Sequence, residues 1–78
     1  MQIQSLFIIV FEYKRNKVLE THMRAFKNSS ALINGLTSII SEYPECDIKR
    51  VFNVTEWGNT TPYELRFNGK FELFKKDA

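Results

Sequence analysis

Apolar and charged positions alternate most regularly near the C-terminus, in residues 63–74. This segment has Asn68-Gly69 at its centre, with Tyr-Glu-Leu-Arg-Phe before the pair and Lys-Phe-Glu-Leu-Phe after it. Period-two alternation on both sides of Asn-Gly is typical of a β-hairpin. A two-residue turn would mix apolar and charged side chains on both faces, so we predict a bulged, longer turn with Gly69 at positive φ. That register pairs Phe67 with Phe71, Leu65 with Leu73, and Arg66 with Glu72.

The N-terminal third of the chain predicts two further strands. Residues 3–13 are apolar on both faces, which indicates an interior strand, and residues 18–26 return after a polar turn at residues 14–17. We assign one face of this pair of strands to the core. Its residues are Leu6, Ile8, Val10, Leu19, Thr21, Met23 and Ala25. The opposite face, here called the aromatic face, carries Phe7, Ile9, Phe11 and Tyr13 beside Val18, Glu20, His22 and Arg24.

The middle of the chain predicts one helix and a third strand. The helix starts at a cap on Asn28 or Ser29 and runs to about Tyr43, where Pro44 ends it. Its apolar stripe consists of Leu32, Leu36, Ile39, Ile40 and Tyr43, with Ile33 at its edge. Residues 47–57 form the strand, with Ile48, Phe52 and Val54 on one face and Val51 on the other.

Together these elements predict an α+β fold in the order ββαβββ. A single antiparallel sheet of about five strands carries one helix on one face, and residues 1–78 form a single domain. The order of strands within the sheet is left open. A core of this size supplies only about 3–5 kcal/mol, and the lone Cys46 excludes an internal disulfide. We therefore expect reinforcement by a partner or by a second copy in a homodimer.

Composition and charge narrow the class of protein only slightly. The chain has 78 residues and is 44% hydrophobic, which is typical of a globular domain. Its net charge of +2 is too small to indicate a nucleic-acid partner and argues against an acidic mimic of DNA. The apolar run at residues 6–11 is too short to span a bilayer, and it lacks the features of a signal peptide. We expect a cytoplasmic protein that does not bind membranes.

The sequence contains no recognisable catalytic constellation. Glu20 and His22 share a strand face and can form a carboxylate–imidazole pair, but Cys46 lies in a different part of the chain. A single histidine and a single cysteine do not build a zinc site, and no phosphate-binding glycine loop is present. We expect no enzymatic activity, no metal and no cofactor.

The aromatic face is the first candidate for partner binding. Phe7, Phe11 and Tyr13, flanked by Arg15 and Arg24, resemble a stacking platform with a basic rim, as used for single-stranded nucleic acid. The alternative is that this face is covered within the chain, by a second copy or by another protein. The basic groups at residues 14–17, 49–50 and 75–76 are expected to be solvated turn and tail residues, or else to contact phosphates.

Two further surfaces are candidates for docking. The outer face of the predicted helix is small and neutral, which would let another backbone approach closely; its residues are Asn34, Gly35, Thr37, Ser38 and Ser41. Trp57 lies at a loop edge, where aromatic residues often contribute to binding, although it could instead close one end of the core.

These observations favour a small non-enzymatic protein that docks on a macromolecular partner and inhibits or modulates it. Short free-standing chains of this kind are common among inhibitors carried by phages and other mobile elements, including anti-CRISPR and antitoxin-like proteins. The alternatives are an RNA- or DNA-binding regulator that uses the aromatic face, and a structural subunit that assembles.

Overall fold

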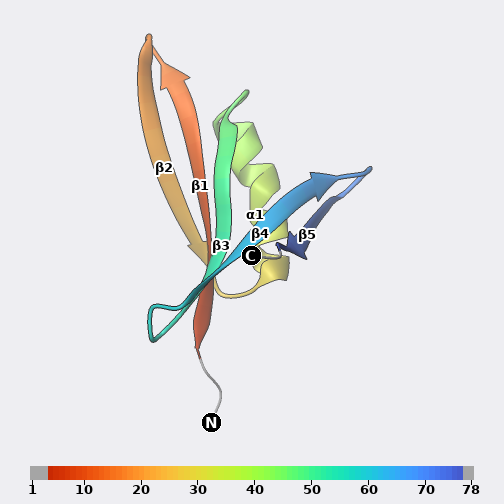
Figure 1. Cartoon of the computed structure of the whole chain (residues 1–78). Coiled ribbons are helices and arrows are strands. Elements are labelled where there is room, and N and C mark those ends of the chain that lie inside the picture. Colours follow the sequence, from red (N-terminus) through yellow and green to blue (C-terminus); the bar gives the residue numbers. More distant parts are fainter. Residues whose placement is uncertain (1–3, 77–78) are drawn as a thin grey trace.

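The computed structural model describes residues 4–76 as a five-stranded antiparallel sheet with one helix. The elements are β1 (Ser5–Arg15), β2 (Val18–Phe26), α1 (Ser29–Glu42), β3 (Asp47–Thr55), β4 (Thr60–Phe67) and β5 (Phe71–Lys75). The strands lie in the order β2-β1-β3-β4-β5, and α1 packs on one face of the sheet (Figure 1). The predicted α+β class and ββαβββ order are confirmed. Two predicted features lie outside the described residues. They are the start of the first strand at Ile3 and the last two residues of the polar C-terminal tail, residues 77–78.

The β1–β2 hairpin has a tighter turn than the sequence predicts. Asn16 and Lys17 form a two-residue turn with φ values of 51° and 68°, so Lys14 and Arg15 continue the strand. Positive φ at both central positions is the signature of a type I′ turn, whose twist matches that of the flanking strands. Because the turn is shorter by an even number of residues, the same residues of β1 and β2 still lie on the same face. The predicted grouping of side chains on the two faces of β1 and β2 is therefore confirmed.

The face that the helix covers is the reverse of the predicted one. Ile9 and Phe11 of β1 and Leu32 and Leu36 of α1 are all 0% exposed, so the core lies between α1 and the aromatic face. The assignment of the Leu6 face to the core is wrong. The aromatic face has the larger apolar side chains on β1 and so gains more from burial. Its charged residues lie on β2, at the sheet edge, where their polar ends reach solvent.

Helix α1 begins and ends where the sequence predicts. The Asn28 side-chain oxygen accepts a hydrogen bond from the Ala31 backbone N–H at 2.7 Å, which is an N-cap contact, and Tyr43 is the C-cap residue before Pro44. Leu32, Leu36, Ile39 and Tyr43 are buried as predicted. Ile40 is 39% exposed, so its predicted place on the buried stripe is wrong.

A β-bulge in β3 changes the face of one predicted residue. Val10 of β1 pairs with Arg50, but the next residue, Phe11, pairs with Ile48, which leaves Lys49 as the extra residue. Ile48 therefore lies on the helix side with Val51, and its predicted grouping with Phe52 and Val54 is wrong. The strand also ends at Thr55 rather than at residue 57.

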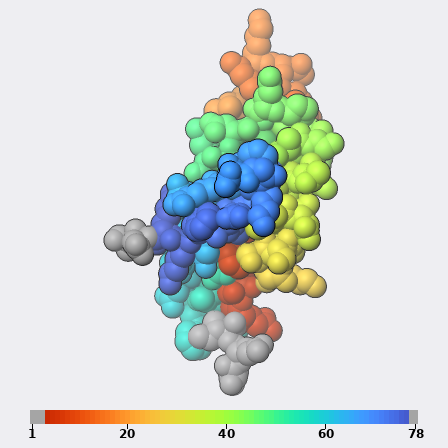
Figure 2. Space-filling model, turned by 90° about the vertical axis from the view of Figure 1, so that its right-hand side faces the viewer, coloured from red at the N-terminus to blue at the C-terminus, as the bar shows by residue number. Residues whose placement is uncertain are grey.

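The C-terminal hairpin has the predicted register. Phe67 pairs with Phe71 and Leu65 with Leu73, and Gly69 has a φ of 80° in the connecting turn. Phe71 and Leu73 pack against the core. Figure 2 shows this hairpin, in blue, lying against α1, so the sheet curls around one side of the helix.

Gly35 is packed between the helix and the sheet, and it is not part of the outer helix face. A Cβ atom at this position would lie 2.5 Å from Cε1 and 2.7 Å from Cζ of Phe26. We expect Gly35→Leu to lower the free energy of unfolding by about 1–2 kcal/mol, because overpacking costs more than the gain in helix propensity. Urea unfolding measures this difference. The matched control is Asn34→Leu at the neighbouring exposed position, which is expected to keep full stability. Equal stability of the two variants would contradict the close packing of Gly35 on Phe26.

Within the described residues, no helix is long and apolar enough to cross a membrane.

Candidate functional site

The aromatic face, the first candidate from the sequence, lies beneath α1. Phe11 is fully buried, and its ring centroid lies 5.2 Å from that of Tyr43 in the helix C-cap. Tyr13 makes an edge contact with the same Tyr43 ring at 5.2 Å, and Phe7 packs edge-on against Tyr63 of β4 at 5.1 Å. Of the outcomes that the sequence left open for this face, the structure has burial within the chain. Phe11 is therefore not accessible to a partner in this fold, and the rings do not form an open stacking platform.

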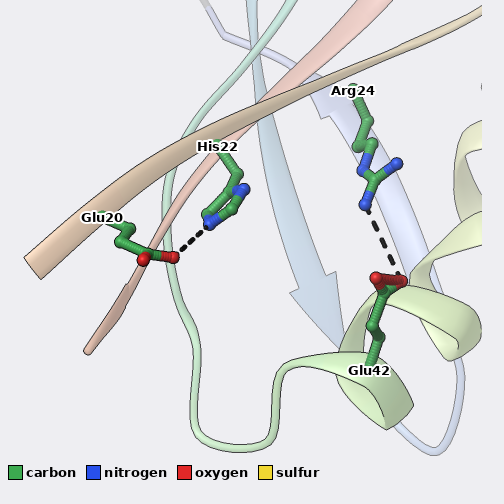
Figure 3. A network of polar contacts seen from close by, with 4 residues as sticks. All are labelled: Glu20, His22, Arg24 and Glu42. Atoms are coloured by element: carbon green, nitrogen blue, oxygen red, sulfur yellow. Dashed lines mark hydrogen bonds and ion pairs between the residues drawn. The ribbon is translucent and has the colours of Figure 1, made fainter. Parts of the chain in front are cut away.

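The two arginines expected at the rim interact with their own chain. Arg24 Nη2 lies 3.7 Å from Glu42 Oε2 near the end of α1 (Figure 3), and the Arg15 guanidinium lies 5.7 Å from the Tyr13 ring centroid. Both residues are largely exposed. Exposed ion pairs contribute only about 0–1 kcal/mol, so both side chains remain available to a partner.

Glu20 and His22 form the pair that the sequence predicts. Glu20 Oε1 lies 3.1 Å from His22 Nε2 (Figure 3), and the imidazole stacks on Phe11 at 5.3 Å and contacts Tyr43 at 4.7 Å. These aromatic contacts hold the ring in place and make it part of the core margin. The pair is a structural contact at the edge of the helix-covered face.

Cys46 is a free, half-buried thiol directly before β3. Burial raises the pKa of the Cys46 thiol above its ordinary value, and a backbone hydrogen bond opposes this only in part. A raised pKa lowers the fraction of thiolate, which is the nucleophilic form. Within residues 4–76, no group of three or more His, Cys, Asp or Glu side chains is arranged to hold a metal ion.

The outer helix face and Trp57 are both accessible. Asn34, Thr37, Ser38 and Ser41 are exposed on the side of α1 away from the sheet. Trp57 is 70% exposed in the turn between β3 and β4, so it does not close the core. Neither place carries a cluster of apolar or charged groups, because Trp57 stands alone and the helix residues are small and neutral.

The surface that the sequence interpretation missed is the opposite side of the sheet, here called the open face. It consists of the residues that alternate with the buried ones on β1, β2 and β3, namely Leu6, Ile8, Val10, Leu19, Thr21, Met23, Ala25, Arg50, Phe52 and Val54. Cross-strand partners share a face, so the register places them together. Leu6, Leu19 and Met23 are 45%, 60% and 62% exposed.

Basic groups lie along one margin of the open face. Arg50 and Lys76 line a depression of about 260 Å³ between β3 and β4, together with Phe52 and Pro62. The Arg50 guanidinium lies 4.7 Å from the Phe52 ring centroid, within cation–π distance. The neighbouring Lys49 lies 2.8 Å from Asp47 and 3.4 Å from Glu12, and Asp47 in particular raises the pKa of its amine. The positive charge of Lys49 is thus neutralised locally, whereas Arg50 forms no ion pair within residues 4–76, although Glu64 lines the same depression.

The signal that could have identified the open face is the size of the side chains. The odd-numbered positions of β1 carry three aromatic rings, at Phe7, Phe11 and Tyr13, whereas the even-numbered positions in the same stretch carry no aromatic ring. A single helix can cover only one face of a sheet, and the face with more apolar area is the favoured one.

Comparison of the chain with protein-family models, curated proteins and solved structures gives no match in any of the three.

Proposed function

We propose that this protein is a non-enzymatic binding protein that docks on another protein and inhibits or modulates it. The observation that carries the proposal is the open face, an apolar sheet surface that no element of the described residues covers. Small monomeric proteins rarely expose a contiguous apolar surface, and such surfaces are typical of interaction sites. An inhibitor carried by a phage or another mobile element is one role that fits a chain of this size.

The chemistry of the open face indicates the kind of partner surface that it fits. Its centre is aliphatic, with Leu6 and Met23 exposed, and charged residues of both signs, among them Lys14, Arg50 and Glu12, lie at its margins. Apolar interface centres with charged margins are usual in protein complexes, where the charges set orientation and association rate. The complementary surface is an apolar patch with charged residues at its rim.

A nucleic-acid partner has less support. The aromatic platform on which that hypothesis was based lies under α1, with Phe11 fully buried. Two aromatic and basic contacts remain on the open side of the sheet, Arg50 with Phe52 and Arg66 with Phe74. In each of them a guanidinium of the same chain lies over the ring, whereas single-strand binding uses aromatic rings on which successive bases stack.

The experiment is an affinity capture from lysate with matched charge variants. The intact chain, Leu6→Glu on the open face and Thr37→Glu on the outer helix face are each immobilised, with and without nuclease treatment. We expect one protein to be recovered with the intact chain and with Thr37→Glu, and to be lost with Leu6→Glu. Circular dichroism is the control for folding. We expect both variants to be folded, because each changed residue is exposed.

The other outcomes would each contradict part of the proposal. Loss with Thr37→Glu and retention with Leu6→Glu would move the docking surface to the helix. Recovery that depends on nucleic acid, and that weakens steeply as salt rises, would replace the protein partner with RNA or DNA. No stoichiometric capture would overturn the proposed function.

A further inference from the structure

Strand β2 forms a long, free edge of the sheet. It has nine residues, pairs with β1 along its whole length and has no second neighbour among the described strands. Figure 1 shows β2 at one margin of the sheet with no other element beyond it. The strand contains no proline, and its register with β1 shows no bulge. Proline and bulges are two of the features by which natural proteins prevent pairing at an exposed edge, and charged side chains are a third. β2 has only the third, and its charges, Glu20 and Arg24, are of opposite sign, so a second copy can match them.

The turn geometry identifies which backbone groups of β2 face outward. The two-residue turn makes Arg15 and Val18 its closing, hydrogen-bonded pair. Hydrogen-bonded and non-bonded pairs then alternate along an antiparallel ladder. The N–H and C=O groups of the even-numbered residues therefore point to β1. The outward groups belong to the odd-numbered residues Leu19, Thr21, Met23 and Ala25.

We propose that β2 pairs antiparallel with β2 of a second copy of this chain, around a twofold axis through His22. This register uses the full strand and sets every outward-facing residue opposite another one. Its pairs are Val18 with Phe26, Leu19 with Ala25, Glu20 with Arg24, Thr21 with Met23, and His22 with its own counterpart. The Glu20–Arg24 pair is of opposite charge and occurs twice because of the symmetry.

The competing registers are less favourable. An axis between two residues would set the outward groups of one strand opposite the inward groups of the other, so the ladder could not form. An axis through Thr21 or Met23 would shorten the paired segment to residues 18–24 or 20–26. The second of these also places His22 opposite Arg24 and leaves Glu20 opposite Phe26. The axis through His22 is the one that combines the longest ladder with charge matching.

Two ion pairs within each copy lie next to the proposed interface between the two β2 strands, here called the seam. Arg24 already lies 3.7 Å from Glu42, and Glu20 lies 3.1 Å from His22, all on the helix side of the sheet (Figure 3). In the dimer, the partner's Glu20 lies beside Arg24, which links the two contacts into one network of alternating charge. Exposed ion pairs add little affinity, so this network mainly sets the register, and the backbone ladder supplies the attraction.

The pairing also joins the open faces of the two copies. Leu19 and Met23, which are 60% and 62% exposed, lie on the open face next to the seam. Two sheets would become one continuous sheet with both helices on the same side. This dimer differs from the one that the aromatic face suggests, because α1 covers that face. The opposite edge, β5, is short at five residues and stays free.

Charge reversal with rescue is the first test of the dimer. Sedimentation of the full chain is measured over about a hundredfold range of concentration, where a reversible dimer shows mass action. We expect Glu20→Arg and Arg24→Glu each to weaken dimerisation by about tenfold, through two like-charge contacts per dimer. The double variant Glu20→Arg/Arg24→Glu is expected to restore the dimer, since it exchanges the charges.

A backbone variant tests the edge directly. Met23→Pro removes one outward N–H and no bond to β1, and proline is tolerated at such edge positions. We expect this variant to stay folded and monomeric, whereas Leu6→Glu, which lies away from the edge, stays dimeric. In the wild type, hydrogen exchange of the Leu19, Thr21, Met23 and Ala25 amides is expected to slow as the concentration rises.

Three results would overturn the dimer. They are a wild type that is monomeric at every concentration, a double charge variant that is no better than the single ones, and outward amides that exchange rapidly in the dimer. A dimer that Leu6→Glu breaks would place the interface on the open face instead. If Met23→Pro fails to fold, the charge-exchange series and the amide exchange still decide. These readouts need no partner protein, so they fail or succeed independently of the proposed function.

Discussion

Replacing Phe11 with glutamate is expected to unfold this protein at every concentration. The ring is 0% exposed and lies between β1, His22 of β2 and Tyr43 of α1. Loss of a buried Phe side chain costs about 3–5 kcal/mol, and an unpaired buried carboxylate adds to that cost. A core of this size supplies only about 3–5 kcal/mol in total. Circular dichroism and urea titration measure the loss of the folded state.

The dependence of folding on protein concentration distinguishes a core position from an interface position. If Phe11 lay in an interface, Phe11→Glu would give a folded but destabilised monomer. That result would contradict the core described here. The matched control is Trp57→Glu, in which another large aromatic residue is replaced at a position that is 70% exposed. We expect its free energy of unfolding to stay within about 0.5 kcal/mol of the wild-type value.

Replacing Tyr43 with alanine is expected to have the second-largest effect, a loss of about 3–5 kcal/mol, which is comparable to the whole stability that a core of this size supplies. Tyr43 is only 7% exposed and contacts three other rings, those of Phe11, Tyr13 and His22. Aromatic pairs contribute about 0.5–1.5 kcal/mol each beyond the area they bury. Because Tyr43 is also the C-cap residue, this variant loosens the end of α1 from the sheet. Thermal and urea unfolding measure the effect.

The control for this variant is Tyr43→Phe. It keeps the ring contacts and removes only the hydroxyl, so we expect a change of at most about 1.5 kcal/mol. A similar loss in both variants would show that the hydroxyl, and not the stacked rings, stabilises this end of the helix.

Local patterns predicted the C-terminal hairpin and the helix correctly. The hairpin register followed from matching Phe67 with Phe71 across the turn, and the structure has that pairing. The helix limits followed from Asn28 at its start and Pro44 beyond its end. In both places the deciding interactions join residues close in sequence, so the sequence pattern contains them.

Long-range packing decided the features that the sequence did not predict. Both faces of β1 are apolar, so its pattern alone does not say which face α1 covers. The bulge at Lys49 inverts the face of Ile48 and depends on pairing with a strand far away in the sequence. Ile40 is 39% exposed, although its helical spacing places it on the apolar stripe of α1.

In the candidate sites, too, local patterns predict some exposed residues, and long-range packing decides the others. The exposure of Arg24, Ser38 and the other polar residues could be predicted from the sequence, whereas for Trp57 the sequence left open whether it closes one end of the core. The open face could not be predicted, because Leu6, Ile8 and Val10 have the composition of a core strand. Only the position of α1 leaves them uncovered.

The sequence by itself determined the element order, the α+β class, the hairpin register and the ends of the helix. The tertiary structure alone decided the strand order, the covered face, the bulge and the free edge at β2. The physical reason is the range of the interactions. Capping, turn geometry and cross-strand matching within a hairpin act between near neighbours, whereas the choice of a face depends on the total apolar area buried by the whole chain.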